Sequence, residues 1–110
     1  MVKKPDEIKK IANRLADALK AKGIKVKRII LYGSYAKGNP KPYSDIDLAV
    51  ISPDFNNKGL LKRQELLGEI IFSLGEPIEA LGYSDKEFKN PPELSFLSEI
   101  ITKGKVVYRG

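Results

Sequence analysis

The sequence contains no cysteine and no histidine, and the two absences exclude several kinds of chemistry. Without cysteine there is no disulfide and no thiolate zinc site, and without either residue there is no catalytic triad built on a thiol or an imidazole. Carboxylates, lysines, hydroxyls and a bound metal ion remain as the chemical repertoire. Because disulfides are rare in the cytosol, the absence of cysteine also favours a cytoplasmic location.

Long apolar runs are also absent, so no segment is expected to span a membrane. The basic start at residues 1–6 is not followed by an apolar stretch, which argues against a signal peptide. The chain has 110 residues, of which 42% are hydrophobic. This length and composition predict a single globular domain over residues 1–110.

Charge is distributed unevenly along the chain. Residues 1–41 hold 12 Lys/Arg and 3 Asp/Glu, whereas residues 42–110 hold 8 and 11. The basic half suggests a wall facing a triphosphate or a nucleic acid. The alternative is a solvated lysine face of the kind common in heat-stable proteins, and we favour it for most of these lysines. The scarcity of glutamine and methionine also fits a thermophile.

The pattern of apolar residues predicts an α/β sandwich. Because the loop between the first two strands is short for a parallel crossover, we predict an antiparallel pair within a mixed sheet, covered by helices mainly on one face. Helical periodicity and capping signals, or runs of β-branched residues, define the expected elements. Helices are expected at 5–22, at 60–74 and from Pro91-Pro92 to just before 104, with a helical turn at 84–88, and extended segments at 26–32, 45–52, 77–83 and 105–108.

Two aspartates carry the strongest chemical signal. Asp45 and Asp47 are two residues apart on a predicted strand, so their carboxylates project from the same face. Like charges side by side are destabilising, and the apolar neighbours Ile46, Leu48 and Val50 leave little room for free solvation. A bound divalent cation resolves this conflict, and oxygen-only ligands favour magnesium or manganese.

A glycine turn just before the aspartates supplies the other half of a site. Gly33 ends the first predicted strand and allows a close approach to the main chain. Ser34 adds a hydroxyl and a helix N-cap, a helical turn at residues 34–37 would aim N–H groups at an anion, and Lys37 adds positive charge. Together with the aspartates, this turn suits a magnesium–nucleoside triphosphate. The alternative is a surface turn followed by a strand with two stray aspartates.

These motifs resemble a known signature. The sequence GSYAKG at residues 33–38, followed by SDIDL at residues 44–48, is similar to the signature of the nucleotidyltransferase superfamily that includes DNA polymerase β. The small size points to its minimal, stand-alone branch (the minimal nucleotidyltransferases, MNT). The ending Ser98-Glu99-Ile100-Ile101, Gly104 and Val107-Tyr108 matches more loosely. The resemblance implies a polymerase-β-like palm with a mixed sheet.

The resemblance also implies three catalytic carboxylates, two from the Asp-x-Asp motif and one from a later strand. Glu79 is the only acidic residue inside the third predicted strand and is therefore the candidate, although an aspartate is more usual there. In the implied two-metal mechanism, Asp45 and Asp47 hold both ions, and Glu79 holds the ion on the nucleophile. The alternative for Glu79 is an exposed glutamate on an edge strand.

Nucleotide-binding roles follow from the same resemblance. Gly33 and Ser34 would bind the triphosphate end of ATP, together with the two aspartates. Lys37 would either neutralise the leaving group or remain solvated, and the sequence does not choose. Three nearby residues could stack on the base or form hydrogen bonds with it, and the sequence does not discriminate among them: Tyr35, Asn39 and Tyr43.

The acceptor is the open question, because the chain is expected to lack an acceptor-binding domain. The resemblance implies transfer of AMP from ATP to a small helical partner, a HEPN protein, in a toxin–antitoxin module and hence a hetero- or homo-oligomer. The competing interpretation is a weakly catalytic binding module that neutralises its partner by contact, which Glu79 at the third position mildly favours. A nucleic-acid binder ranks last, because the basic half lacks interleaved aromatics.

Overall fold

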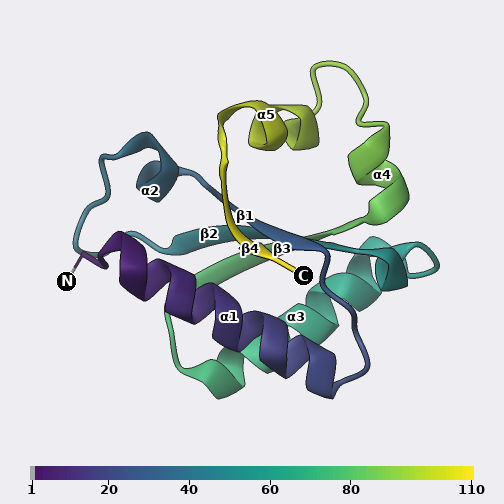
Figure 1. Ribbon diagram of the computed structural model, residues 1–110, viewed down its shortest axis with the longest axis horizontal. Helices are drawn as coiled ribbons and strands as arrows, with labels where there is room; N and C mark the ends of the chain where they lie inside the picture. Colours follow the sequence, from purple (N-terminus) through teal and green to yellow (C-terminus); the bar gives the residue numbers. More distant parts are fainter. Residues whose placement is uncertain (1) are drawn as a thin grey trace.

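The computed structural model describes residues 2–110 as a four-stranded sheet with helices on both faces (Figure 1). No helix within these residues is both long and apolar enough to cross a bilayer. The elements in chain order are α1 (Pro5–Ala21), β1 (Arg28–Tyr32), α2 (Ser34–Lys37), β2 (Ile46–Ser52), the 3-10 turn η1 (Pro53–Phe55), α3 (Leu60–Leu74), β3 (Ile78–Ser84), α4 (Asp85–Lys89), α5 (Phe96–Lys103) and β4 (Lys105–Arg109).

The sheet is mixed, with the strand order β3-β2-β1-β4. Strand β1 pairs antiparallel with both β2 and β4, whereas β2 and β3 are parallel. The antiparallel pairing of the first two strands, predicted from their short connection, is therefore confirmed. The register places Tyr32 opposite Asp47 and places Asp47 beside Glu79. Three residues from three different strands thus meet at one end of the sheet.

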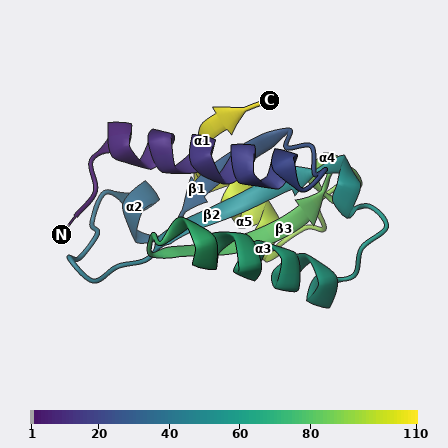
Figure 2. The ribbon, with the colours of Figure 1, turned by 90° about the horizontal axis from the view of Figure 1, so that it is seen from below.

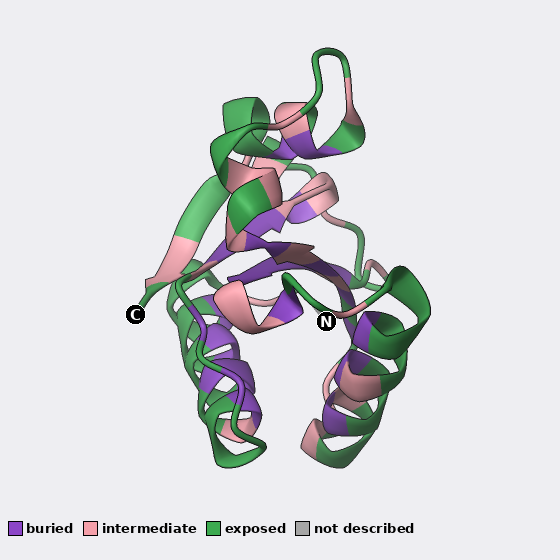
Figure 3. Cartoon of the chain, turned by 90° about the vertical axis from the view of Figure 1, so that its right-hand side faces the viewer, coloured by how far each residue is buried: buried purple, intermediate pink, exposed green. Residues whose placement is uncertain are grey.

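The two long helices cover one face of the sheet, and the shorter α4 and α5 lie over the other (Figures 1 and 2). In Figure 3 the buried residues, drawn in purple, lie in the sheet and on the inward sides of the two long helices. The apolar stripe predicted for the first helix is fully buried there. The larger core includes Ile8, Ile11, Leu15, Leu19, Ile29, Leu31, Ile46, Leu48, Val50, Phe55, Leu67 and Ile70.

The second face carries a smaller core and the candidate site. Ile30, Ala49 and Ile51 of the sheet pack there with Ile100 of α5. Because side chains alternate along a strand, Asp47 shares this face with Ala49 and Ile51. The face is covered only in part by α4 and α5, so the end of the sheet that carries Asp47 stays accessible.

Arg63 on α3 is a buried cation that the sequence analysis did not single out. Its guanidinium donates to the backbone carbonyls of Lys58 (2.8 Å), Phe55 (2.8 Å) and Gly82 (3.2 Å), and to Glu87 Oε1 (2.7 Å). Burial alone would raise the pKa of Glu87, but hydrogen bonds from a backbone amide and from the guanidinium outweigh it and hold that pKa below its ordinary value. Arg63 therefore ties η1, α3, β3 and α4 together.

Two details of the predicted helices were wrong. Helix α3 has the predicted bounds, but Leu60 is exposed and the buried stripe runs through Arg63 instead. The last helix begins at Phe96 and not at Pro91-Pro92. The hydroxyl of Ser95 accepts the N–H of the third helical residue at 3.0 Å, while a turn with a positive φ of 59° at Leu94 precedes it. A side-chain cap therefore decided where the helix starts.

Candidate active site

The turn after β1 is built around Gly33. This residue has φ 75° and ψ −153°, a backbone conformation that is closed to other residues, and it is itself the N-cap of α2. The N-cap predicted for Ser34 was therefore wrong, because Ser34 is the first helical residue and its side chain caps nothing. Among residues 2–110, the backbone N–H groups of Ser34 and Tyr35 have no hydrogen-bond partner. Two donors at this turn are thus available to an anion.

The carboxylate of Asp47 lies directly against this turn. A Cβ on Gly33 would collide with Asp47 Oδ2 and would stand 3.0 Å from Asp47 Cγ. The glycine is therefore needed for its backbone angles and also for the space that it leaves to the carboxylate. The turn and the carboxylate form one local structure, although 14 positions separate them in the sequence.

The other two predicted carboxylates lie on either side. Glu79 is the register neighbour of Asp47 on the edge strand β3, and Asp45 comes just before β2. Asp47 is half-buried, whereas Asp45 and Glu79 are exposed. The expectation that neither aspartate is freely solvated thus holds only for Asp47. None of the three side chains forms a hydrogen bond or an ion pair with any residue in the range 2–110.

The pKa values of Asp47 and Tyr32 reflect burial and the negative potential of the neighbouring carboxylates. Burial, followed by the charges of Glu79 and Asp45, raises the pKa of Asp47 above its ordinary value. Burial, followed by the charges of Asp47 and Glu79, also raises the pKa of the Tyr32 hydroxyl well above its ordinary value. A half-buried carboxylate next to two further negative charges makes a site that favours a cation.

The donor set suits a hard divalent cation in its chemistry. It consists of carboxylate oxygens, the ligands that Mg²⁺ and Mn²⁺ prefer, and a cation would offset both the burial of the Asp47 carboxylate and its repulsion by Glu79 and Asp45. Within residues 2–110 no three such side chains are already gathered into a metal cluster. Asp45 and Glu79 are exposed and have no ion-pair partner among residues 2–110, so their side chains can turn toward an ion beside Asp47.

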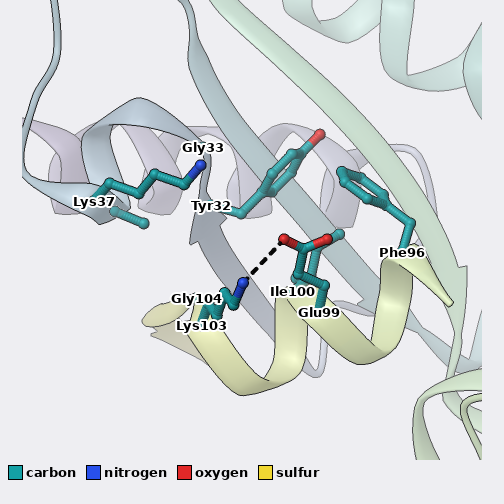
Figure 4. Close-up of a pocket in the computed structure, with 9 residues that line it drawn as sticks. Tyr32, Gly33, Lys37, Phe96, Glu99, Ile100, Lys103 and Gly104 are labelled. Carbon is teal, nitrogen blue, oxygen red and sulfur yellow. Dashed lines mark hydrogen bonds and ion pairs between the residues drawn. The ribbon is translucent and has the colours of Figure 1, made fainter. Parts of the chain in front are cut away.

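A cavity of about 160 Å³ adjoins the turn and has α5 as its second wall. Figure 4 shows Lys37 on the side of the turn, and Glu99 and Lys103 on α5 across from it. Glu99 and Lys103 form an ion pair of 3.4 Å. The sequence analysis did not assign α5 to the site, although the loosely matching C-terminal ending was a signal for it. The lining is completed by Tyr32, Gly33, Ala36, Phe96, Ile100 and Gly104.

The residues predicted to contact the base differ in how far they are exposed. Tyr35 is buried, and its hydroxyl accepts the backbone N–H of Lys3 at 3.0 Å, so the prediction that it contacts a base was wrong. Asn39 and Tyr43 are exposed in the loop between α2 and β2, and contact with a base stays a prediction for both. Lys37 is exposed at the cavity and has no ion-pair partner among residues 2–110.

Residues 8–108 match the family model described as a nucleotidyltransferase domain. The chain belongs to the nucleotidyltransferase family. The predicted membership and the predicted class of enzyme, a transferase of nucleotidyl groups, are both confirmed. A putative protein adenylyltransferase of Methanocaldococcus jannaschii is 31% identical over 101 residues, which is 90% of this chain and 96% of that protein.

Solved structures of nucleotidyltransferases share the fold. A putative nucleotidyltransferase from Sulfolobus solfataricus matches with a TM-score of 0.62 at 14% identity, over 99% of this chain and 90% of that one. A toxin–antitoxin crystallised with AMP-PNP matches with a TM-score of 0.61 at 23% identity, and a mutant of the toxin–antitoxin MntA–HpeT with 0.59 at 21%; each match covers 90% of this chain and 73% of the other. The predicted polymerase-β-like fold is thereby confirmed.

Proposed function

We propose that this nucleotidyltransferase transfers AMP from ATP to a hydroxyl group of a partner protein, and that it requires Mg²⁺ or Mn²⁺. The observation that carries the proposal is the contact between the Asp47 carboxylate and the Gly33 turn, with Glu79 beside it. In this contact, carboxylate oxygens of a kind that suits a metal ion lie next to two backbone N–H groups without a partner among residues 2–110, which supports the proposal. The adenylyl group and the protein acceptor are supported by the M. jannaschii relative, whose name specifies a protein adenylyltransferase.

The residues would divide the work as follows. The turn at Gly33 and Ser34 would receive the β- and γ-phosphates, because the N–H groups of Ser34 and Tyr35, which have no partner among residues 2–110, lie there. Asp45 and Asp47 would hold the metal ions, whose charge would offset that of the phosphates. Glu79 would complete the ligands of the ion at the acceptor oxygen, and Lys37 would balance charge on the pyrophosphate.

In the reaction, the acceptor hydroxyl gives its proton to water and its oxygen attacks the α-phosphorus. The bond from that phosphorus to the bridging oxygen of the β-phosphate breaks, releasing pyrophosphate. Bound divalent cations would lower the pKa of the acceptor hydroxyl and stabilise the leaving group. The protein contributes position: β2 and β3 run parallel in register, so Asp47 and Glu79 are held side by side. The Gly33 turn fixes the phosphate chain relative to both carboxylates.

The acceptor in this proposal is a second, small helical protein of the HEPN type. Two of the solved structures with this fold are toxin–antitoxin proteins, which supports a protein partner. Aromatic residues are enriched at interfaces, and Phe96, which is 52% exposed and lines the cavity, is the aromatic residue that we propose for contact with the partner. Phe88 and Tyr108 are half-buried and serve mainly as packing.

Transfer is tested with ATP labelled on either the α- or the γ-phosphate, magnesium, and a HEPN-type protein encoded by a gene beside that of this chain. Label from the α-phosphate should appear on that protein, should require the metal, and should be lost with Asp47→Asn. Label from the γ-phosphate would indicate a kinase and contradict the proposal. If the neighbour binds and no label transfers, the second candidate, a binding module that acts by contact, is favoured instead.

A further inference from the structure

Helix α5 brings a cation to the cavity from the side opposite the Gly33 turn. The cavity has Lys37 on the turn and Lys103 on the last turn of α5 (Figure 4). Both lysines are exposed, and neither is tied to the three carboxylates at the end of the sheet. The cavity thus has two cations on its walls while the carboxylates lie just beyond its Gly33 side.

The position of Lys103 relative to the turn is fixed by the next residue. A Cβ on Gly104 would meet the carbonyl oxygen of Ile100 at 2.5 Å, a methyl group of Ile30 at 2.6 Å and the carbonyl oxygen of Leu31 at 2.9 Å. The end of α5 therefore lies directly on β1, two residues before Gly33. Lys103 is held at this point by backbone packing and not by its own side-chain contacts.

The side chain of Lys103, in contrast, is weakly held. Its partner is Glu99, one helical turn earlier, and both side chains are more than half exposed (68% and 52%). Exposed pairs at this spacing contribute only about 0.3–0.5 kcal/mol, so an anion of higher charge displaces Glu99 easily. The backbone carbonyls at the end of α5 would repel a phosphate, and Lys103 is the group on that wall able to offset them.

We infer that Lys103 binds the pyrophosphate portion of the nucleoside triphosphate, opposite Lys37. When no nucleotide is bound, Lys103 forms its ion pair with Glu99 instead. The size of the cavity suits a part of the nucleotide and not the whole molecule. Its volume of about 160 Å³ lies below the roughly 300–1,000 Å³ of sites that take a whole drug-sized molecule. We place the phosphate chain between the two lysines and the base outside the cavity. The inference rests on the proposed function and adds α5 to its binding site.

The test is calorimetric titration of the purified chain with ATP and, separately, with AMP, both with magnesium. Lys103→Gln should weaken ATP binding about 5- to 10-fold, at the low end for a charge-assisted bond because the site is exposed, and should leave AMP binding unchanged. Lys89→Gln is the matched control, since Lys89 on α4 also forms an i,i+4 pair, with Asp85 at 3.1 Å and 67% exposure, but does not line the cavity. Glu99→Gln should tighten ATP binding.

The outcomes separate this inference from the proposed function. Equal ATP affinities for Lys103→Gln and the unsubstituted chain would overturn the role of Lys103 while leaving the proposed function intact. An equal loss for ATP and AMP would also overturn it, because Lys103 would then contact the nucleoside or its α-phosphate. Unsubstituted chain that binds no ATP at all would instead contradict the proposed function.

Discussion

The carboxylate of Asp47 occupies the space in which any side chain on residue 33 would have to stand. Gly33 combines this crowding with φ 75° and ψ −153°, so two independent constraints select glycine at one position. The contact joins the end of β1 to the start of β2 across the antiparallel pair. Binding at the turn and ligation by the carboxylate should therefore fail together.

Gly33→Ala tests this coupling. We expect a loss of stability of about 1–3 kcal/mol from the strained backbone and a loss of Mg–ATP affinity of about tenfold or more, because Asp47 must move. Gly38→Ala is the matched control, since Gly38 also has positive φ (81°) but a Cβ there meets nothing within 4 Å. Denaturant unfolding and calorimetry measure both quantities. Equal ATP affinity in the two variants would contradict the coupling.

Asp47→Asn should stabilise the metal-free protein. The folded state raises the pKa of Asp47, so its ionised form costs stability, and this cost appears as pH rises through the folded pKa. At neutral pH in EDTA we expect the thermal midpoint of the variant to rise by about 2–5 °C. A gain of roughly 1 kcal/mol moves the midpoint of a small domain by about 4–8 °C, and we expect a smaller gain here because Asp47 is only partly buried. Near pH 3 the difference should vanish. A lower midpoint at neutral pH would show that Asp47 is structural.

Glu79→Ala should abolish transfer and leave ATP binding largely intact. Glu79 is exposed beside Asp47, and we assign to it only the ion at the nucleophile, which matters mainly in the transition state. Removing one such group typically lowers the rate on the order of 10²–10³-fold. Asp47→Ala should weaken both binding and transfer. Full activity of Glu79→Ala on the true acceptor would exclude Glu79 as the third carboxylate.

Arg63→Ala should destabilise the fold by about 3 kcal/mol, because it removes a buried cation with four hydrogen-bond partners. Arg14→Ala is the control: Arg14 also bonds a glutamate (3.0 Å) and a carbonyl (3.2 Å), but it is half exposed and should cost about 1 kcal/mol or less. Urea unfolding distinguishes the two. Similar losses would show that the Arg63 network is no more than a surface pair.

Local patterns predicted most of the elements, because their causes are local. The 3.6-residue stripe of α1 and the closing Gly75 of α3 lie within one helix, and the predicted core residues Ile46 and Leu48 are buried as their alternation indicates. The start of α5 was missed because two signals competed. Pro91-Pro92 favours a first turn, but the Ser95 cap prevailed.

Parts of the site depend on pairing between distant strands. The spacing of Asp45 and Asp47 was readable in the sequence, and Glu79 was found as the acidic residue of the third strand. The parallel register that puts Glu79 beside Asp47 was not readable, because nothing local encodes it. Arg63 had a readable signal, because it lies four residues before Leu67 and seven before Ile70, on the same helical stripe.

The central claim is that the Gly33 turn and the carboxylates bind a nucleoside triphosphate through a shared metal ion. Calorimetric titration of the unsubstituted chain with ATP, first with magnesium and then with EDTA, tests it most directly. We expect binding with magnesium, recovery with manganese, and a loss of affinity of at least about tenfold in EDTA, corresponding to about 1.4 kcal/mol. Equal ATP affinity with magnesium and with EDTA would contradict the metal-bridged site.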